Sequence, residues 1–161
     1  MSGDIFLKLD GIEGESADSK HKGEMQLETF SWGESNATSF THGTGGGVGK
    51  VHMQDIHFTK VIDKGSPNLM LACASGKHIA SGMITFRKAG EEQQEFLKIK
   101  LTDVMVASIT LQDHSAGATL PHESVALSFG KIEMEYKPQK KDGQLDGAVP
   151  FGWDIKENKK V

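Results

Sequence analysis

The chain has 161 residues, of which 25% are charged and 37% hydrophobic, and its formal net charge at pH 7 is −4. This length fits a single domain, residues 1–161, with a substantial core. The acidic balance argues against a nucleic-acid-binding protein, whose surface normally carries a basic patch, and a single cysteine, Cys73, excludes an internal disulfide.

The first part of the chain predicts one short strand followed by a loop. Residues 5–9 alternate apolar and polar side chains and end at Asp10-Gly11, a common turn pair. Residues 13–23 mix acidic and basic side chains without helical or strand periodicity. We therefore expect them to form a solvated surface loop.

Residues 25–32 predict a second strand with a break in its alternation. Phe30 and Trp32 have the opposite parity to the apolar residues before them. A β-bulge near residues 28–29 would turn both sets toward the core. Beyond the bulge, Ser31 is expected on the opposite, outward face.

Residues 33–49 contain six of the nineteen glycines of the chain. Such a segment is too flexible to pack and predicts a protruding hairpin or loop. It is not a nucleotide-binding P-loop, because Gly49-Lys50 is followed by Val51 instead of serine or threonine, and a strand follows instead of a helix.

A strand pattern over residues 51–62 precedes the only substantial helix that we expect, residues 67–75. Ser66 is the predicted N-cap, Pro67 suits the first helical position, and Gly76 suits the C-terminal end.

Six apolar residues in a row, 69–74, surround this helix with an apolar belt instead of a single stripe. Leu69, Ala72 and Cys73 share one face, while Leu71 points elsewhere. Two interpretations remain open: the helix plugs the end of its own barrel, or its second side meets another subunit.

The rest of the chain predicts an all-β fold. Expected strands cover residues 79–88, 96–111, 124–136 and 151–156. The buried parity shifts near Asp103, after which Ile109 and Leu111 point inward again, and shifts once more at Gly130. Long strands that change their buried face predict an antiparallel β-barrel of two curved sheets, with about eight strands and one short helix.

The sequence contains no catalytic, cofactor-binding or metal-binding motif. No HExxH, HxH or CxxC pattern is present, and His52 and His57 point to opposite faces of a strand. We expect scattered surface histidines: His21, His42, His52, His57, His78, His114 and His122.

Five blocks in order resemble the Hcp family, the haemolysin-coregulated tube proteins of bacterial type VI secretion. They are SWG at residues 31–33, GKVHMQDIHFTKVIDK, SPNLMLACASGKH, FRKAG at residues 86–90, and YKPQKKDG followed by FGWDIKEN. The resemblance covers essentially the whole chain.

The resemblance implies a non-enzymatic β-barrel protein that assembles into hexameric rings. Rings would stack into a tube that a contractile sheath propels and a spike protein caps, with effectors carried and stabilised inside. The protein would be made in the cytoplasm and secreted without a cleaved signal peptide, since the N-terminus shows none, and no segment would insert into a membrane. The alternative from a different class is a monomeric β-barrel that binds a small ligand beneath a glycine-rich lid.

Three groups of site residues follow from the pattern and the resemblance together. Ser31 is expected to contact effectors in the ring lumen. The helix residues expected at the subunit interface are Leu69, Met70, Leu71 and Ala74. The residues expected in ring stacking are Thr41, His42, Gly43, Thr44, Gly45, Gly46, Gly47, Val48, Gly49, Lys50, Ala89, Gly90 and Glu91.

Overall fold

The computed structural model describes residues 3–40, 47–113 and 120–161. Within these residues it contains eleven strands, paired antiparallel, and one helix. In chain order the elements are β1 (Asp4–Leu9), β2 (Met25–Leu27), β3 (Thr29–Ser31), β4 (Glu34–Ser39), β5 (Gly47–Met53), β6 (Ile56–Val61), α1 (Ser66–Ser75), β7 (Ile79–Arg87), β8 (Glu95–Gln112), β9 (His122–Tyr136), β10 (Val149–Asp154) and β11 (Lys159–Lys160).

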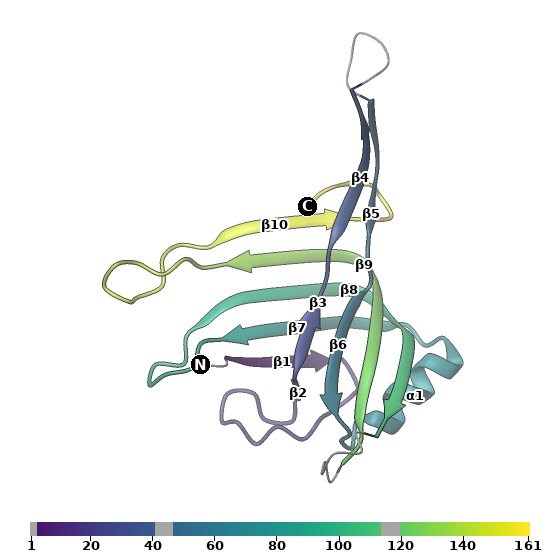
Figure 1. Cartoon of the computed structure of the whole chain (residues 1–161), viewed down its shortest axis with the longest axis vertical. Helices are drawn as coiled ribbons and strands as arrows, with labels where there is room; N and C mark the ends of the chain where they lie inside the picture. Colours follow the sequence, from purple (N-terminus) through teal and green to yellow (C-terminus); the bar gives the residue numbers. More distant parts are fainter. Residues whose placement is uncertain (1–2, 41–46, 114–119) are drawn as a thin grey trace.

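The strand pairing closes on itself. β1 pairs with β2, the chain bends at Glu28, and β3 then pairs with β6. From β6 the pairing continues through β9, β8 and β7 back to β1. The predicted barrel of two curved sheets is confirmed, and β10 and β11 extend one sheet beyond β9. Figure 1 shows β1, β7 and β10 running across the molecule, whereas β3 and β6 follow its long axis.

The two sheets meet at a corner made by Asp103 in β8 and Gly130 in β9. Asp103 has a φ of 59°, in the left-handed region that residues with a side chain seldom adopt. Gly130 packs close to this residue: a Cβ on it would lie 3.4 Å from the Cβ of Asp103. The buried side of β8 changes here, from Leu101 before the corner to Val104 after it. The predicted shift near Asp103 and Gly130 is confirmed.

A second shift in β8 lies between Val106 and Ser108, where the register against β9 changes. It returns Ile109 to the core side, as predicted. The prediction for Leu111 was wrong, because its side chain is 49% exposed. Leu111 is the last residue but one of β8, in the stretch of that strand that pairs only with β9.

The break predicted near residues 28–29 is a change of strand partner instead of a simple bulge. Met25 is buried in β2, which pairs with β1, and Phe30 packs on the core from β3, which pairs with β6. The ring of Phe30 meets that of Phe86 edge-on at 5.0 Å between centroids. One bent segment therefore supplies core residues to both sheets.

Helix α1 begins one residue earlier than predicted. Gly65 is the N-cap, and the hydroxyl oxygen of Ser66 instead accepts a hydrogen bond from the backbone N–H of Asp63 at 2.9 Å. The predicted end is confirmed, since Gly76 adopts a left-handed φ of 66°.

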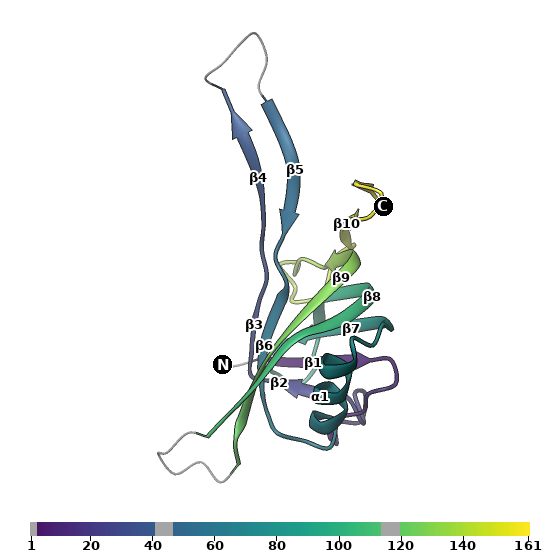
Figure 2. The same cartoon turned by 90° about the vertical axis from the view of Figure 1, so that its right-hand side faces the viewer.

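The glycine-rich region contains a two-stranded hairpin, β4 with β5. All six residues of β4 are exposed. Figures 1 and 2 show the hairpin extending away from the barrel along the long axis of the molecule.

Residues 13–23 form a surface loop without helix or strand, as predicted, and contacts of Asp18 and His21 dock this loop onto the barrel. The guanidinium of Arg87, which is only 2% exposed, donates hydrogen bonds to the carboxylates of Asp18 and Asp4. It also lies over the ring of Phe6, 4.9 Å from the centroid. These contacts tie the loop to β1 and β7.

His21 completes this attachment and is buried, contrary to the expectation of a surface histidine. Its ring stacks on Phe6 with 4.3 Å between centroids. Its two nitrogens each lie 2.7 Å from a carboxylate oxygen, one of Glu24 and one of Glu95. Ionised carboxylates only accept hydrogen bonds, so this geometry suits a ring that donates from both nitrogens.

Candidate functional site

One sheet presents an open outer face on the side opposite the core. It is built from β3, β6, β9 and the C-terminal half of β8, paired in that order. Directly opposed residues of antiparallel strands project on the same face, so the register defines rows of neighbouring side chains. The rows are Ser31, His57, Ala126 and Ser108; Thr29, Thr59, Ser124 and Thr110; and Val61, His122 and Gln112. We call these eleven residues the hydroxyl face.

The middle row of the hydroxyl face consists entirely of threonine and serine. The hydroxyls of Thr29 and Thr59 are hydrogen-bonded to each other at 2.6 Å. A shallow hollow lies over the first two rows. Each hydroxyl can donate one hydrogen bond and accept two, so the row retains capacity for a partner.

None of the eleven residues is lysine, arginine, aspartate or glutamate. The nearest carboxylate contact is at the border, where His122 Nδ1 lies 2.6 Å from Glu28. The face is thus polar without being charged.

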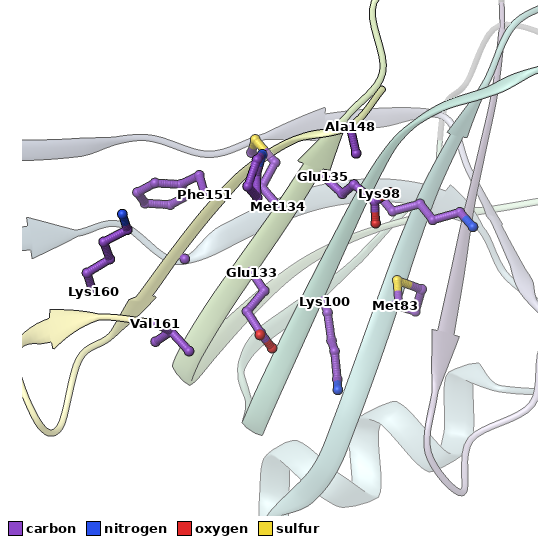
Figure 3. A pocket seen from close by; sticks show the side chains of 12 residues that line it. Met83, Lys98, Lys100, Glu133, Met134, Glu135, Ala148, Phe151, Lys160 and Val161 are labelled. Carbon is purple, nitrogen blue, oxygen red and sulfur yellow. The ribbon is translucent and has the colours of Figure 1, made fainter. Parts of the chain in front are cut away.

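The other half of β8 and β9 has a charged outer face. Lys98 is opposite Glu135, and Lys100 is opposite Glu133. Figure 3 shows these side chains along a groove that continues to Phe151 on β10. No described residue lining this groove is serine, threonine, cysteine or histidine, so it offers no nucleophile paired with a base.

The orientation predicted for Ser31 is confirmed. Phe30 packs on the core, Trp32 lies 6.4 Å from Phe151 between ring centroids, and Ser31 is exposed over the hollow. Its contact with cargo stays a prediction.

The helix residues predicted at a subunit interface separate into two groups. Leu69 is fully buried in the core of its own chain, so its assignment to an interface was wrong. Met70 is half-buried and Ala74 is exposed. Leu71 is 66% exposed, a large apolar side chain without cover from its own chain. These three remain candidates for an interface.

The residues predicted to mediate stacking lie in two separate places. Thr41 to Gly46 fall outside the described residues, while Gly47 to Lys50 belong to β5 in the projecting hairpin. Ala89, Gly90 and Glu91 form an exposed turn between β7 and β8, on a different side of the barrel from the hairpin in Figure 1. The structure does not bring the two groups together within one chain.

The hydroxyl face beyond Ser31 was missed by the sequence analysis. A signal was present, because hydroxyl residues recur at a spacing of two in Thr29/Ser31 and Ser108/Thr110. To join these pairs into rows, the order of the strands in the sheet has to be known, and only the structure gives it.

Among the described residues, no group of three or more histidine, cysteine, aspartate or glutamate side chains could hold a metal ion. The described part of the chain also contains no helix with the length and apolarity needed to cross a membrane.

Comparisons with known proteins identify the family. Residues 6–136 match the model of the family described as "Type VI secretion system effector, Hcp". The chain is 46% identical over 160 residues to protein hcp1 of Pseudomonas aeruginosa, covering 98% of both chains. The chain belongs to the Hcp family.

Solved structures agree with this assignment. A structure described as a type six secretion system protein superposes on this Hcp chain with a TM-score of 0.93 at 30% identity, covering 99% of this chain and 100% of the other. Hcp1 from Salmonella typhimurium gives a TM-score of 0.80 at 37% identity, with 100% of both chains covered.

Membership in the Hcp family makes this chain a structural tube protein of type VI secretion and not an enzyme. It also accounts for the lack of a catalytic motif in the sequence. None of these relatives supports the alternative of a monomeric small-ligand-binding barrel.

Proposed function

We propose that six copies of this Hcp chain form a ring whose central hole is lined by the hydroxyl face. Rings stack into a tube, and effectors are carried and stabilised inside it. The tube is propelled by a contractile sheath, is capped by a spike protein, and leaves the cell without a cleaved signal peptide. The size of the ring and these partners come from the family resemblance.

The observation that carries the ring is a sheet with two unpaired edges. Within the described residues, β3 pairs only with β6, and residues 105–112 of β8 pair only with β9. These two edges flank the hydroxyl face on opposite sides. Unpaired edges attract further strands unless they are protected by charge or proline, and neither edge segment contains a charged residue or proline.

Opposite edges of one sheet suit a head-to-tail contact, in which β3 of one copy lies beside β8 of the next. A head-to-tail contact that repeats from copy to copy makes a closed ring when the rotations between successive copies add up to a full turn. In such a ring the sheets become a continuous wall, and all hydroxyl faces point the same way.

Helix α1 lies beside the β8 edge and supports the same contact. A Cβ on Gly76, which ends α1, would lie 3.9 Å from the side chain of Met105, where the unpaired stretch of β8 begins. The exposed side chain of Leu71 is on this helix. Met70, Leu71 and Ala74 are thus placed to meet the neighbouring copy.

Light scattering with size-exclusion chromatography tests the ring. We expect a species of about 105 kDa, six copies of the 17.5 kDa chain. Disulfide trapping tests the arrangement: in a Cys73→Ala background, Ser31→Cys with Ser108→Cys, and Thr29→Cys with Thr110→Cys, should yield oxidised ladders that end at six subunits. Ser31→Cys with Thr102→Cys serves as the control, because Thr102 lies beyond the corner at Asp103. A strict monomer at micromolar concentration would refute the ring.

A further inference from the structure

We infer that the hydroxyl face binds uncharged polar stretches of polypeptide through neutral hydrogen bonds, so that retention of cargo is independent of salt. The inference rests on the proposed function, which makes this face the wall of the hole. It adds the chemical class of the partner and assigns the middle row, Thr29, Thr59, Ser124 and Thr110, as its principal contact.

Charged side chains are absent from the hydroxyl face, although the other half of β8 and β9 carries them on its outer face. A quarter of the residues in the chain are charged. On one side of the corner, the outer face of β8 and β9 presents Lys98, Lys100, Glu133 and Glu135. On the other side of the corner, the outer face of the same two strands carries Met105 and Ser128 and then the hydroxyl, amide, imidazole and methyl groups of the hydroxyl face, without a charged residue. A partner at the first two rows therefore meets uncharged hydrogen-bonding groups, and the carboxylate of Glu28 lies at the border, beside His122 in the third row.

The described geometry leaves the row able to bind. The bond between Thr29 and Thr59 uses one of their two protons, so the row retains at least one donor there and further acceptors. The side chains are short, and the hollow over them leaves space for a main chain to approach. Peptide groups and the side chains of asparagine, glutamine, serine and threonine supply the matching donors and acceptors.

Other polymers fit the face less well. Nucleic acid needs cations against its phosphates, and single strands also need aromatic side chains for base stacking. The eleven residues include no lysine, arginine, phenylalanine, tyrosine or tryptophan. An uncharged polypeptide surface is the partner that this set satisfies.

Neutral hydrogen bonds are individually weak, so retention has to come from their number. Each contributes little net free energy, because it replaces a bond to water. A ring repeats the row in every subunit, and a partner held at several rows gains from high effective concentration. Such binding tolerates partners of varied sequence. Salt does not weaken it, whereas salt screens the attraction between exposed charged groups.

Fluorescence anisotropy with three labelled 24-residue peptides tests this on the assembled protein. One peptide contains only asparagine, glutamine, serine and glycine; in the other two, every fourth residue is lysine or glutamate. The neutral peptide should bind most tightly, and its Kd should change less than about twofold between 50 and 500 mM NaCl.

Isosteric substitutions locate the contact. Thr59→Val with Thr110→Val removes two hydroxyls and keeps β-branched side chains, and it should weaken binding of the neutral peptide about tenfold. Thr102→Val is the matched control on the same strand, because Thr102 faces Lys131 in the charged half; it should leave Kd unchanged. Thr59→Lys should create binding of the glutamate peptide that is lost at 500 mM NaCl.

The outcomes separate this inference from the proposed function. Light scattering first establishes that every variant assembles like the wild type. The inference is overturned if a charged peptide binds best, is released by salt, and no longer binds to the Ser31→Gln variant. That result would still support the hydroxyl face as the cargo surface, so the proposed function would stand. If no peptide binds, or if Ser31→Gln and the valine variants bind like the wild type, the hydroxyl face is not a cargo surface and both proposals fail.

Discussion

Lys60 and Glu123 form an ion pair of 2.9 Å between Nζ and Oε2, with both side chains completely buried. They join β6 to β9 directly behind the hydroxyl face. Lys60 Nζ also reaches the carboxylate of Asp63 at 2.9 Å and donates to the hydroxyl of Ser66 at 3.2 Å. One buried ammonium therefore connects the sheet to the start of α1.

Removing this ammonium alone should destabilise the barrel strongly. Lys60→Met leaves two carboxylates without their counter-charge, and breaking a buried pair in this way costs about 3–5 kcal/mol. Adding Glu123→Leu to Lys60→Met should recover part of the lost free energy of unfolding, because it removes the buried carboxylate that Lys60 no longer neutralises. Urea unfolding measures both effects. Lys64→Met is the control: its exposed pair with Glu13 at 3.4 Å should contribute less than about 1 kcal/mol. Equal losses for Lys60→Met and Lys64→Met would contradict this account.

Acid should loosen the loop that docks onto β1 and β7. Hydrogen bonds from the guanidinium of Arg87 and the backbone N–H of Lys20 hold the pKa of Asp18 well below its usual range. Burial opposes ionisation of Glu95, but the hydrogen bond from His21 and the positive charge of Lys98 outweigh it and lower its pKa. A carboxyl group with a lowered folded pKa stabilises the protein above its unfolded pKa of about 4, and this contribution is lost as the pH falls through the folded value.

The melting temperature should therefore fall as the pH is lowered below about 4. Asp18→Asn should lower the melting temperature at pH 7 and approach the wild type at pH 2, where less of the carboxylate contribution remains. Asp10→Asn, at an exposed position in the turn after β1, is the matched control. A constant difference between Asp18→Asn and the wild type across this range would refute the prediction.

Leu71→Glu should break rings and leave a folded barrel. Leu71 is 66% exposed, so the barrel itself tolerates a charge there, whereas an unpaired charge in a subunit interface costs several kcal/mol. Light scattering should report smaller species, with an unchanged circular dichroism spectrum. Asn68→Glu provides a second exposed charge on the same helix as a control. If Leu71→Glu remains hexameric, α1 serves only its own barrel.

Deleting Gly43 to Gly47 should prevent tubes but not single rings. Gly43 to Gly46 fall outside the described residues, and Gly47 is the first residue of β5 in the projecting hairpin. Ordering a glycine-rich segment on stacking costs conformational entropy, which would make stacking weak and reversible. Electron microscopy should show single rings of normal size. Normal tubes would exclude a role for this segment in stacking.

Ser31→Gln should reduce cargo binding without affecting the hexamer. The exposed position accommodates a longer neutral side chain, while the core beneath it, with Phe30, is unchanged. Co-purification and cellular levels of at least one effector should fall relative to the wild type. Ser31→Ala, which removes the hydroxyl without adding bulk, shows whether bulk or the lost hydrogen bond is responsible. Wild-type levels of every tested effector in Ser31→Gln rings would show that Ser31 is not a cargo contact.

The sequence predicted local features correctly where a residue type has a strong conformational preference or where the alternation of a strand fixes the side on which a side chain lies. Gly76 ends α1 because glycine adopts the left-handed conformation at low cost. The change of buried side near Asp103 and Gly130 followed from the period of two, and so did the outward position of Ser31. Five blocks in order then sufficed for the family, which the comparisons confirm.

Features that depend on which strands are neighbours required the tertiary structure. The docking of residues 13–23 arises because Arg87, far along the chain, is buried and needs carboxylate partners. Leu69 looked like an interface residue because an apolar belt does not reveal which side of a helix its own core covers.

The sequence by itself determined the elements, the parity of their side chains and the family. Only the tertiary structure decided that Thr29, Thr59, Ser124 and Thr110 form one row. Alternation along a strand fixes the face of each residue, since the period of two is local. The order and register of strands are set by long-range pairing, which joins residues up to 65 positions apart in this row, Thr59 and Ser124, and leaves no periodic trace in any one segment.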